Sequence, residues 1–204
     1  MDTVRKMTEQ DIPQAAQVIG RAFCDNPVMV AIIERDAEKR AQSLGQFHQR
    51  ALSVFLRAGA CWVLTEDEQV RSVMLTLPPG SYPLAWHRDL KLVWSSFVIG
   101  GFRPTRRFTQ VDDFVRQRHP RHEHTYLYLL GTEPVVQGCG YASRLLSRLA
   151  EETAGGEVYL ETDHPKNLPF YERHGYHIVG QEQCLLQPEG FPLWFMSNRP
   201  ERYR

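Results

Sequence analysis

The sequence predicts a mixed α/β domain, in which a central sheet is covered by helices on both faces. Two strand-like runs within 60–77 form a hairpin pattern, and a short apolar run at 126–130 gives way to an amphipathic helix near residue 141. The 204 residues are 42% hydrophobic and 24% charged, which is sufficient for one substantial core. We therefore expect residues 1–204 to form a single domain.

Capping and breaking signals define the first elements. Residues 4–7 are typical of an edge strand. Residues 8–11 place an acidic side chain three positions after a capping threonine, which predicts a helix through about Phe23. The run Asp25-Asn26-Pro27 then ends this helix, because the residue before a proline disfavours helical geometry.

A long helix and a hairpin follow. Apolar residues recur at every third or fourth position from about 36 to 58, which predicts an amphipathic helix closed by Gly59. Residues 60–65 and 70–77 are strand-like runs joined by the charged turn 66–69, so we expect them to pair as a hairpin.

The next region is predominantly helical in pattern. Helices are predicted at 84–99 and 106–118, separated by the glycines and proline of 100–104. Three histidines follow around a proline, and we expect them in a solvated polar loop: His119, His122 and His124.

The second half alternates strands and helices. The run 126–130 is too short for a helix and predicts a buried strand, and the helix that starts near Tyr141 is stopped by Gly155-Gly156. The remaining elements are a strand at 158–163, a short helix between Asn167 and Gly175, and strands at 177–186 and 193–197.

The junction between strand and helix, 137–143, has the features of a phosphate-binding loop. Gly138 and Gly140 permit a sharp turn, and the free N–H groups of the first helical turn suit a pyrophosphate. A bare turn without ligand is the alternative. No Gly-Lys-Ser or Gly-Lys-Thr occurs, which excludes a nucleotide P-loop. A dinucleotide-binding site remains a weakly supported alternative, because Ser143 occupies the position of the third glycine. Glu161 does lie at the distance along the chain where that motif has its acidic residue.

Charge and hydropathy exclude several classes of protein. Lysine plus arginine equals aspartate plus glutamate at 24 each, so neither nucleic acid nor an anionic membrane is expected as a partner. The first residues lack the apolar core of a secretory signal, and the apolar stretch 90–102 is broken by polar residues and glycines. We expect a cytoplasmic protein.

The cysteines and histidines do not form a metal site in sequence. The four cysteines are scattered, which argues against both zinc and a disulfide framework: Cys24, Cys61, Cys139 and Cys184. Cys139 at a helix N-terminus has some features of a nucleophile, but a spectator thiol is the better interpretation.

Two motifs resemble those of the GNAT superfamily of N-acetyltransferases. Residues 134–146 resemble its acetyl-CoA-binding motif, with Gln137, Gly140 and Ala142 at the three defining positions. Residues 160–176 resemble its second CoA-contacting strand and helix, and together with the tail 188–196 they are similar to the small-molecule branch that includes puromycin N-acetyltransferases.

The resemblance implies a fold and a reaction. It implies a mostly antiparallel sheet with a splayed strand pair at the acetyl-CoA site. It further implies transfer of an acetyl group from acetyl-CoA, the co-substrate, to a primary amine of a small molecule by direct attack in a ternary complex, without a metal. A protein or peptide N-acetyltransferase and a non-catalytic CoA-binding module are the alternatives. We expect an antibiotic-resistance-like enzyme that is a monomer or a homodimer.

The same resemblance implies which residues contact the coenzyme. The strand end would offer unpaired backbone groups to the pantetheine amides, the loop would bind the pyrophosphate, and the second motif would contact the CoA arm. Asn167 is also expected to cap its short helix. The predicted contacts are Leu130, Gly131, Thr132, Gln137, Gly138, Cys139, Gly140, Tyr141, Ala142, Ser143, Asn167 and Tyr171.

Two residues are predicted to handle protons. Tyr171 matches the family tyrosine that protonates or hydrogen-bonds the departing CoA sulfur. An amine of pKa about 10.4 must also lose a proton before attack, and Glu161, on the polar face of a short interior strand, is the first candidate base. A structural role for Glu161 is equally open, and Asp25, Glu66 or water are the other candidates.

The aromatic residues of the helical region have two interpretations. In the small-molecule branch, an insertion between the third and fourth strands lies beside the acceptor. Trp86, Trp94 and Phe97 would then line a substrate cleft, although aromatic residues at helical spacing are more often core residues.

Overall fold

The computed structural model describes residues 2–83, 101–186 and 190–203, and their strands form one seven-stranded sheet. The strand order is β1-β2-β3-β4-β5-β7-β6, and β4 and β5 are its parallel pair, the other neighbours being antiparallel. The strands are β1 (Asp2–Lys6), β2 (Ala60–Glu66), β3 (Gln69–Leu77), β4 (Thr125–Thr132), β5 (Val158–Thr162), β6 (His177–Cys184) and β7 (Phe191–Ser197). The predicted mixed, mostly antiparallel sheet is thus confirmed.

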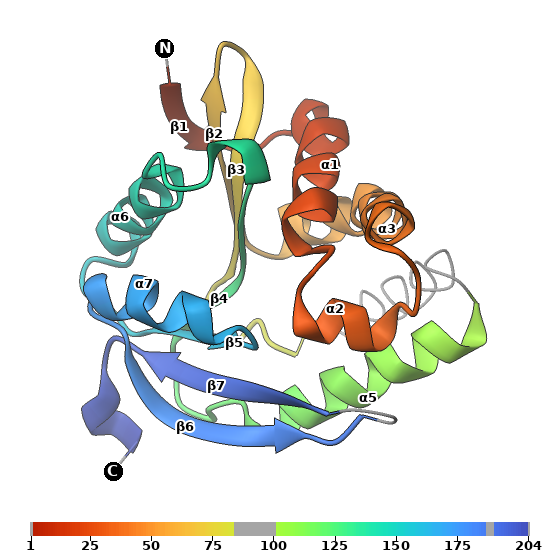
Figure 1. The fold of residues 1–204 in the computed structure, drawn as a ribbon. Helices are drawn as coiled ribbons and strands as arrows, with labels where there is room; N and C mark the ends of the chain where they lie inside the picture. Colours follow the sequence, from red (N-terminus) through yellow and green to blue (C-terminus); the bar gives the residue numbers. More distant parts are fainter. Residues whose placement is uncertain (1, 84–100, 187–189, 204) are drawn as a thin grey trace.

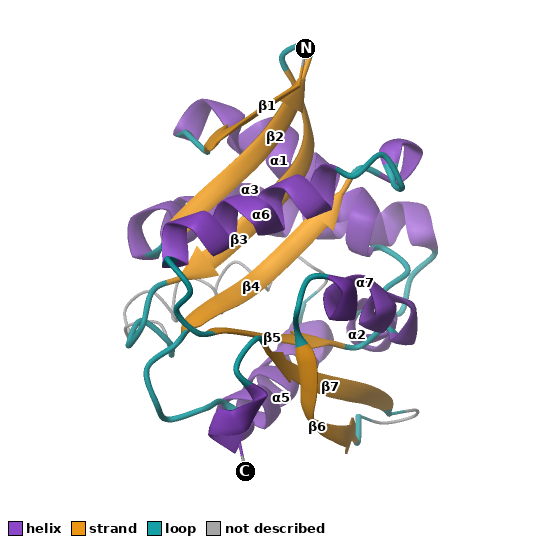
Figure 2. Cartoon of the chain, turned by 90° about the vertical axis from the view of Figure 1, so that its left-hand side faces the viewer, coloured by secondary structure: helices purple, strands orange, loops and turns teal. Residues whose placement is uncertain are grey.

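Helices cover both faces of this sheet (Figures 1 and 2). One hydrophobic cluster joins α1 and α3 to one face, with α2 and α5 beside them, and a second cluster joins α6 and α7 to the other face. The helices are α1 (Ile12–Phe23), α2 (Pro27–Ile32), α3 (Ala37–Ala58), α5 (Phe102–Arg118), α6 (Tyr141–Thr153) and α7 (Leu168–Arg173).

The first helix is fixed at both its start and its middle. The Thr8 backbone N–H donates to Asp11 Oδ2 at 2.8 Å, which forms the predicted capping box through a short 3₁₀ turn. Gly20 lies against α3, where a Cβ would stand 2.5 Å from the Ala41 carbonyl oxygen. The absence of a side chain at Gly20 therefore allows α1 and α3 to pack with close backbone approach.

The helices differ from the sequence prediction in two places. Helix α1 ends at Phe23, as expected, but Pro27 is the first residue of α2, which was not predicted, because the missing N–H of a proline is not needed there. Helix α5 begins at Phe102 rather than at 106, because Pro104 lies in its first turn. The predicted helix 84–99 lies outside the described residues, and Trp86, Trp94 and Phe97 lie there with it.

The parallel pair β4 and β5 separates soon after it forms. The two strands pair only at Thr125 with Val158 and at Tyr126 with Tyr159, and Figure 2 shows them diverging beyond that point. Strand β4 also bulges at Tyr128, which has no partner on β3. Residues 127–132 therefore present an edge of β4 that is not paired with β5.

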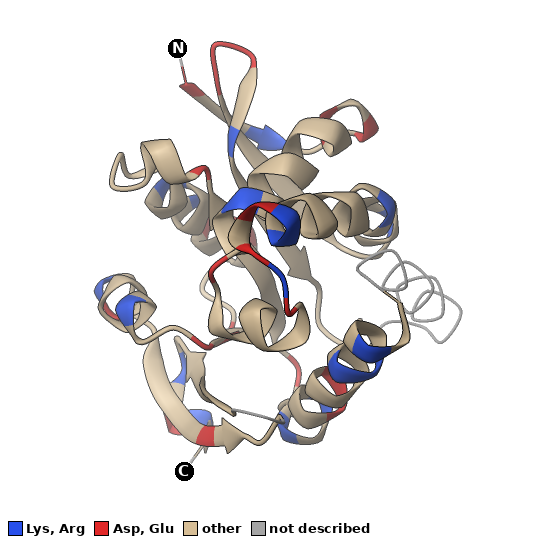
Figure 3. Ribbon diagram, turned by 45° about the vertical axis from the view of Figure 1, so that its right-hand side comes forward, with Lys and Arg blue, Asp and Glu red and all other residues tan. Residues whose placement is uncertain are grey.

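Charged residues of both signs are distributed over most elements and are interspersed along α5 (Figure 3). This distribution agrees with the equal totals of acidic and basic residues. Among the described residues, none of the helices combines the length and apolar character needed to cross a membrane.

Candidate active site

The loop before α6 presents backbone donors at an open surface. Gly138 and Gly140 have φ values of +85° and +81°, and Gly140 is the N-cap residue of α6. The bond from Arg144 N to Gly140 O, at 3.1 Å, closes the first turn. The N–H groups of Tyr141, Ala142 and Ser143 therefore precede the intrahelical ladder. A Cβ at Gly138 or Gly140 would meet nothing within 4 Å, so these glycines serve backbone conformation and not packing.

The side chains of this loop differ in their exposure and in their hydrogen-bond partners. Gln137 Nε2 donates to the Thr132 carbonyl at 3.3 Å, which joins the loop to the end of β4. Cys139 is exposed. The Tyr141 hydroxyl donates to Glu66 Oε1 at 2.6 Å, and Arg71 Nε lies 3.3 Å from Glu66 Oε2. Glu66 is thus held by this tyrosine and this arginine.

The end of β4 is paired on one side only. Leu130, Gly131 and Thr132 pair with β3, while their other edge faces the gap that β5 leaves. A Cβ on Gly131 would stand 2.7 Å from Phe23 Cε2, so this glycine allows the last residue of α1 to pack on the strand. Thr132 Oγ1 lies 2.8 Å from Ser72 Oγ.

Helix α7 stands at the end of β5 and carries Tyr171. The side chain is buried, and burial first, then the neighbouring Tyr176 and Asp163, raises the pKa of Tyr171 above its usual value. Its phenol is therefore protonated at neutral pH. Asn167 is the N-cap residue of α7, but its side chain donates to Thr162 Oγ1 at 3.0 Å and makes no capping bond. The predicted capping role of Asn167 is wrong, because Thr162 is the partner of its amide.

An aromatic cavity of about 180 Å³ lies on the α1 and α3 side of the sheet. Its walls come from α1, α2, α3 and α5 and from the diverging strands β4 and β5. Its lining residues are Phe23, Asn26, Val28, Met29, Ile32, Leu44, Phe47, His48, Tyr82, Phe108, Val111, Asp112, Val115, Tyr126, Tyr128, Leu129, Glu161, Thr162, Asp163 and Leu193.

Glu161 is the one of the three predicted candidate bases that lines this cavity. Its side chain is 8% exposed, and its Oε1 lies 3.6 Å from His119 Nδ1. Burial, together with the Glu161 carboxylate, raises the pKa of the Tyr126 and Tyr159 phenols well above the usual value, so both remain protonated beside it. The side chain of Asp25, by contrast, is 79% exposed and pairs with Arg40.

Asp163 and His48 are among the polar residues of the cavity that were not predicted. Asp163 accepts the Val28 N–H at 2.7 Å, which attaches α2 to the end of β5, and burial raises the pKa of Asp163. His48 is buried, and this lowers its pKa to about 4, so the ring is neutral at pH 7. The alternation of Tyr159, Glu161 and Asp163, along β5 and just past its end, was the available signal for Asp163, whereas nothing in the sequence pattern distinguished His48 from the core of α3.

The histidine loop differs from its prediction. The side chain of His119 is 7% exposed because its ring packs against Tyr126 and Tyr159, and His124 is buried with its ring against Tyr159. A solvated loop was therefore the wrong expectation for these two residues. In the described part of the chain, no group of three or more His, Cys, Asp or Glu side chains is arranged to hold a metal ion.

Comparisons with known proteins find acetyltransferases that are similar to this chain. A family model for the acetyltransferase (GNAT) domain matches residues 108–178. An uncharacterised N-acetyltransferase of Schizosaccharomyces pombe is 25% identical over 211 aligned positions, which cover 97% of this chain and 83% of the relative.

Solved structures share the fold. One, described as histone acetyltransferase HPA2 and related acetyltransferase from Corynebacterium glutamicum, has a TM-score of 0.71 at 22% identity and covers 97% of this chain and 95% of its own. Arylalkylamine N-acetyltransferase 2 from Aedes aegypti has a TM-score of 0.64 at 12% identity, with 96% and 97% covered.

Proposed function

Because the domain match, the yeast relative and the shared fold support an N-acetyltransferase with the GNAT fold, we propose that this chain acetylates a primary amine of a small molecule. The fold implies acetyl-CoA as the co-substrate. The observation that carries the proposal is the gap between β4 and β5. The glycine loop before α6, which resembles a phosphate-binding loop, lies at one end of this gap, and the aromatic cavity with Glu161 lies on one face of it. We take residues 1–204 as one catalytic domain.

The residues around the gap fit the coenzyme. The first-turn N–H groups of α6, at its positive dipole end, suit the pyrophosphate, and the unpaired edge of β4 suits the pantetheine amides. The open space over Gly138 and Gly140 leaves room for the phosphates. The proposed contacts are those predicted from the sequence: Leu130, Gly131, Thr132, residues 137–143, Asn167 and Tyr171.

The cavity suits a cationic amine with an apolar or aromatic body. Its carboxylates are Asp112, Glu161 and Asp163, its one basic side chain among the described lining residues is the neutral His48, and six of its lining residues are Phe or Tyr. Negative charge attracts an ammonium group, and aromatic faces contribute cation–π and hydrophobic contacts. This composition favours a small amine over a protein or peptide acceptor, for which a longer acidic groove is expected.

Acetyl-CoA supplies the activated thioester. Glu161 takes the proton that the acceptor ammonium must lose, after which the amine nitrogen forms a bond to the acetyl carbon. The carbon–sulfur bond then breaks, and Tyr171 donates its phenolic proton to the departing thiolate. The second proton, which the nitrogen loses as the amide forms, restores the Tyr171 phenol through solvent. The protonated state of Tyr171 at neutral pH, caused by its burial, suits this role.

Acetyl-CoA binding is the first testable consequence. At a concentration 100-fold above the dissociation constant, a ligand that binds only the folded state adds about 2.7 kcal/mol to the free energy of unfolding. For a domain of this size we expect Tm to rise by about 5–10 °C in a thermal unfolding experiment. The absence of any rise at millimolar acetyl-CoA would contradict the proposed coenzyme site.

Two glycines at opposite ends of α6 provide a matched pair of variants. Gly140→Ala and Gly155→Ala each place a Cβ at a positive φ, so each should destabilise the free protein by about 1 kcal/mol. Only Gly140→Ala alters the proposed phosphate loop, so it alone should reduce the Tm rise caused by acetyl-CoA. An equal rise of Tm with acetyl-CoA in both variants would show that the coenzyme does not bind at this loop.

A further inference from the structure

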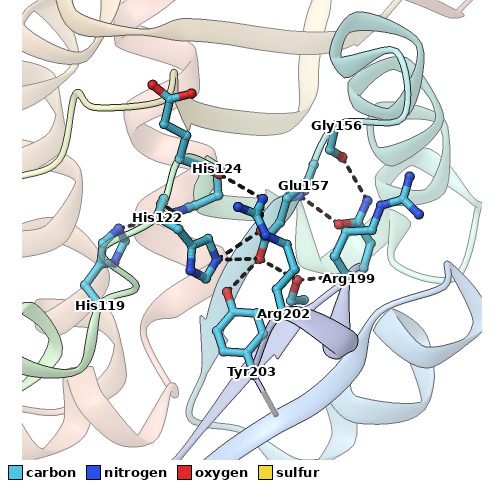
Figure 4. A network of polar contacts seen from close by, with 12 residues as sticks. His119, His122, His124, Gly156, Glu157, Arg199, Arg202 and Tyr203 are labelled. Atoms are coloured by element: carbon cyan, nitrogen blue, oxygen red, sulfur yellow. Dashed lines mark hydrogen bonds and ion pairs between the residues drawn. The ribbon is translucent and has the colours of Figure 1, made fainter.

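The imidazole rings of His119 and His124 lie in a row that starts at Glu161 and extends away from the aromatic cavity. His119, the C-cap residue of α5, has its Nδ1 3.6 Å from Glu161 Oε1. Its other nitrogen, Nε2, lies 2.9 Å from Nε2 of His124, just before β4. Figure 4 shows His119, His122 and His124 close together, with the His122 ring turned toward Glu157. Each step is therefore a contact between side chains that are almost fully buried.

The hydrogen bonds determine where the protons of these rings lie. His124 Nδ1 is 2.7 Å from the His122 carbonyl oxygen, which can only accept, so this nitrogen carries the hydrogen. Burial lowers the pKa of His124, and the neutral ring then presents an unprotonated Nε2 toward His119. His119 Nε2 must donate to it, which leaves His119 Nδ1 as a bare lone pair facing Glu161.

This assignment explains two buried atoms that otherwise have no partner. Within the part of the chain that the structure describes, neither Glu161 Oε1 nor His119 Nδ1 makes a hydrogen bond. A carboxylate oxygen and an imidazole lone pair are both acceptors, so they cannot bond to each other until a proton arrives. A proton taken up by Glu161 would complete the contact and could pass directly to His119.

A second hollow lies behind the tyrosine wall of the cavity. It has a volume of about 90 Å³, and it is lined by both His119 and His124. Tyr82 and Tyr126 line this hollow and the acceptor cavity alike, so these rings separate the two spaces. The Tyr82 ring centroid lies 4.2 Å from that of His119. The imidazoles therefore reach a space that is distinct from the one the substrates would occupy.

We propose that His119 is a proton-relay residue, which passes the proton from Glu161 to His124 and to water in the second hollow. The inference rests on the proposed role of Glu161 as the base. Protonated Glu161 gives its proton to His119 Nδ1, and His119 gives up the proton on Nε2 to His124 or to water. Glu161 is restored as a carboxylate while the substrates still fill the cavity.

Among the described residues, several aromatic and charged groups face His119 and His124. His119 faces Tyr82 from the loop after β3, Tyr126 from β4, and Tyr159 and Glu161 from β5. His124 faces Tyr159 and His122, and the latter pairs with Glu157 at 3.0 Å. Asp112, with its partner Arg116, lies beyond Tyr82 on α5.

The test is the dependence of kcat on the concentration of a small buffer base. His119→Asn keeps a polar side chain that cannot carry a proton, so kcat should fall by about ten- to hundredfold in dilute buffer. Added imidazole, entering the hollow, should restore kcat without changing KM, whereas the wild-type rate should be independent of imidazole. His122→Asn, in the same loop but paired with Glu157, is the matched control and should show no such dependence.

The possible outcomes test the relay role of His119 and the base role of Glu161 separately. A wild-type rate for His119→Asn at every buffer concentration, or a folded variant whose loss is not restored by imidazole, would overturn the relay while leaving Glu161 as the base. Full activity of Glu161→Gln would instead overturn the base, and the relay with it. Should His119→Asn fail to fold, as judged by its thermal transition, His124→Asn tests the next step, and its rate must show the same imidazole dependence.

Discussion

Replacing Glu161 with Gln is expected to lower kcat by about 10²- to 10⁴-fold, the usual range for the loss of a general base. Gln keeps the shape of the side chain but cannot accept the proton of the acceptor ammonium. Steady-state release of free CoA thiol, measured across pH with a saturating amine, provides the rate.

The coenzyme should still bind to this variant, because Glu161 lines the aromatic cavity and does not lie at the loop before α6. Acetyl-CoA should therefore raise Tm of Glu161→Gln as much as it does for the wild type. Asp25→Asn is the matched control, since Asp25 is also a carboxylate predicted from the sequence but lies on the surface. Comparable losses of kcat in Glu161→Gln and Asp25→Asn would show that the loss comes from the removed charge and not from the lost proton transfer.

Tyr171→Phe is expected to lower kcat by about 10²-fold and to leave the affinity for acetyl-CoA nearly unchanged. The substitution removes only the hydroxyl that would protonate the departing thiolate, while the ring remains in the hydrophobic cluster with Tyr176. Turnover and the acetyl-CoA dissociation constant are measured separately, by thiol release and by calorimetry.

Tyr176→Phe is the control for this variant. Tyr176 is also buried, and its ring centroid lies 5.9 Å from that of Tyr171, so the two substitutions remove the same atom from neighbouring sites. We expect a near wild-type rate for Tyr176→Phe. Equal rates for Tyr171→Phe and the wild type would remove Tyr171 from the chemistry.

The sequence predicted the elements that depend on local periodicity. The hairpin of β2 and β3, the long α3, and the helix that starts at Tyr141 were all expected and are confirmed. Their apolar spacing and their terminating glycines act over a few residues, so the pattern alone contains the information. The glycine loop was predicted from the same kind of local pattern, whereas the role of Tyr171 was predicted from the family resemblance and stays a prediction.

Features that depend on contacts between distant segments were not predicted. The histidine loop is polar in sequence, and only the convergence of Tyr82, Tyr126 and Tyr159 makes a buried site for His119. Asn167 has the residue type of a helix cap, yet its amide binds Thr162 instead. Helix α2 was missed because six residues give too little periodicity to separate it from a turn.

The central claim is tested most directly by thiol release from acetyl-CoA in the presence of individual amines. A panel of aralkylamines, polyamines, aminonucleosides, aminoglycosides, amino acids and peptides with free N-termini distinguishes the acceptor classes. We predict stoichiometric CoA release with a small cationic amine that has an apolar or aromatic body, and the loss of this release in Glu161→Gln. Turnover with peptides alone would contradict the small-molecule assignment, and no turnover with any amine, despite bound acetyl-CoA, would contradict the enzymatic one.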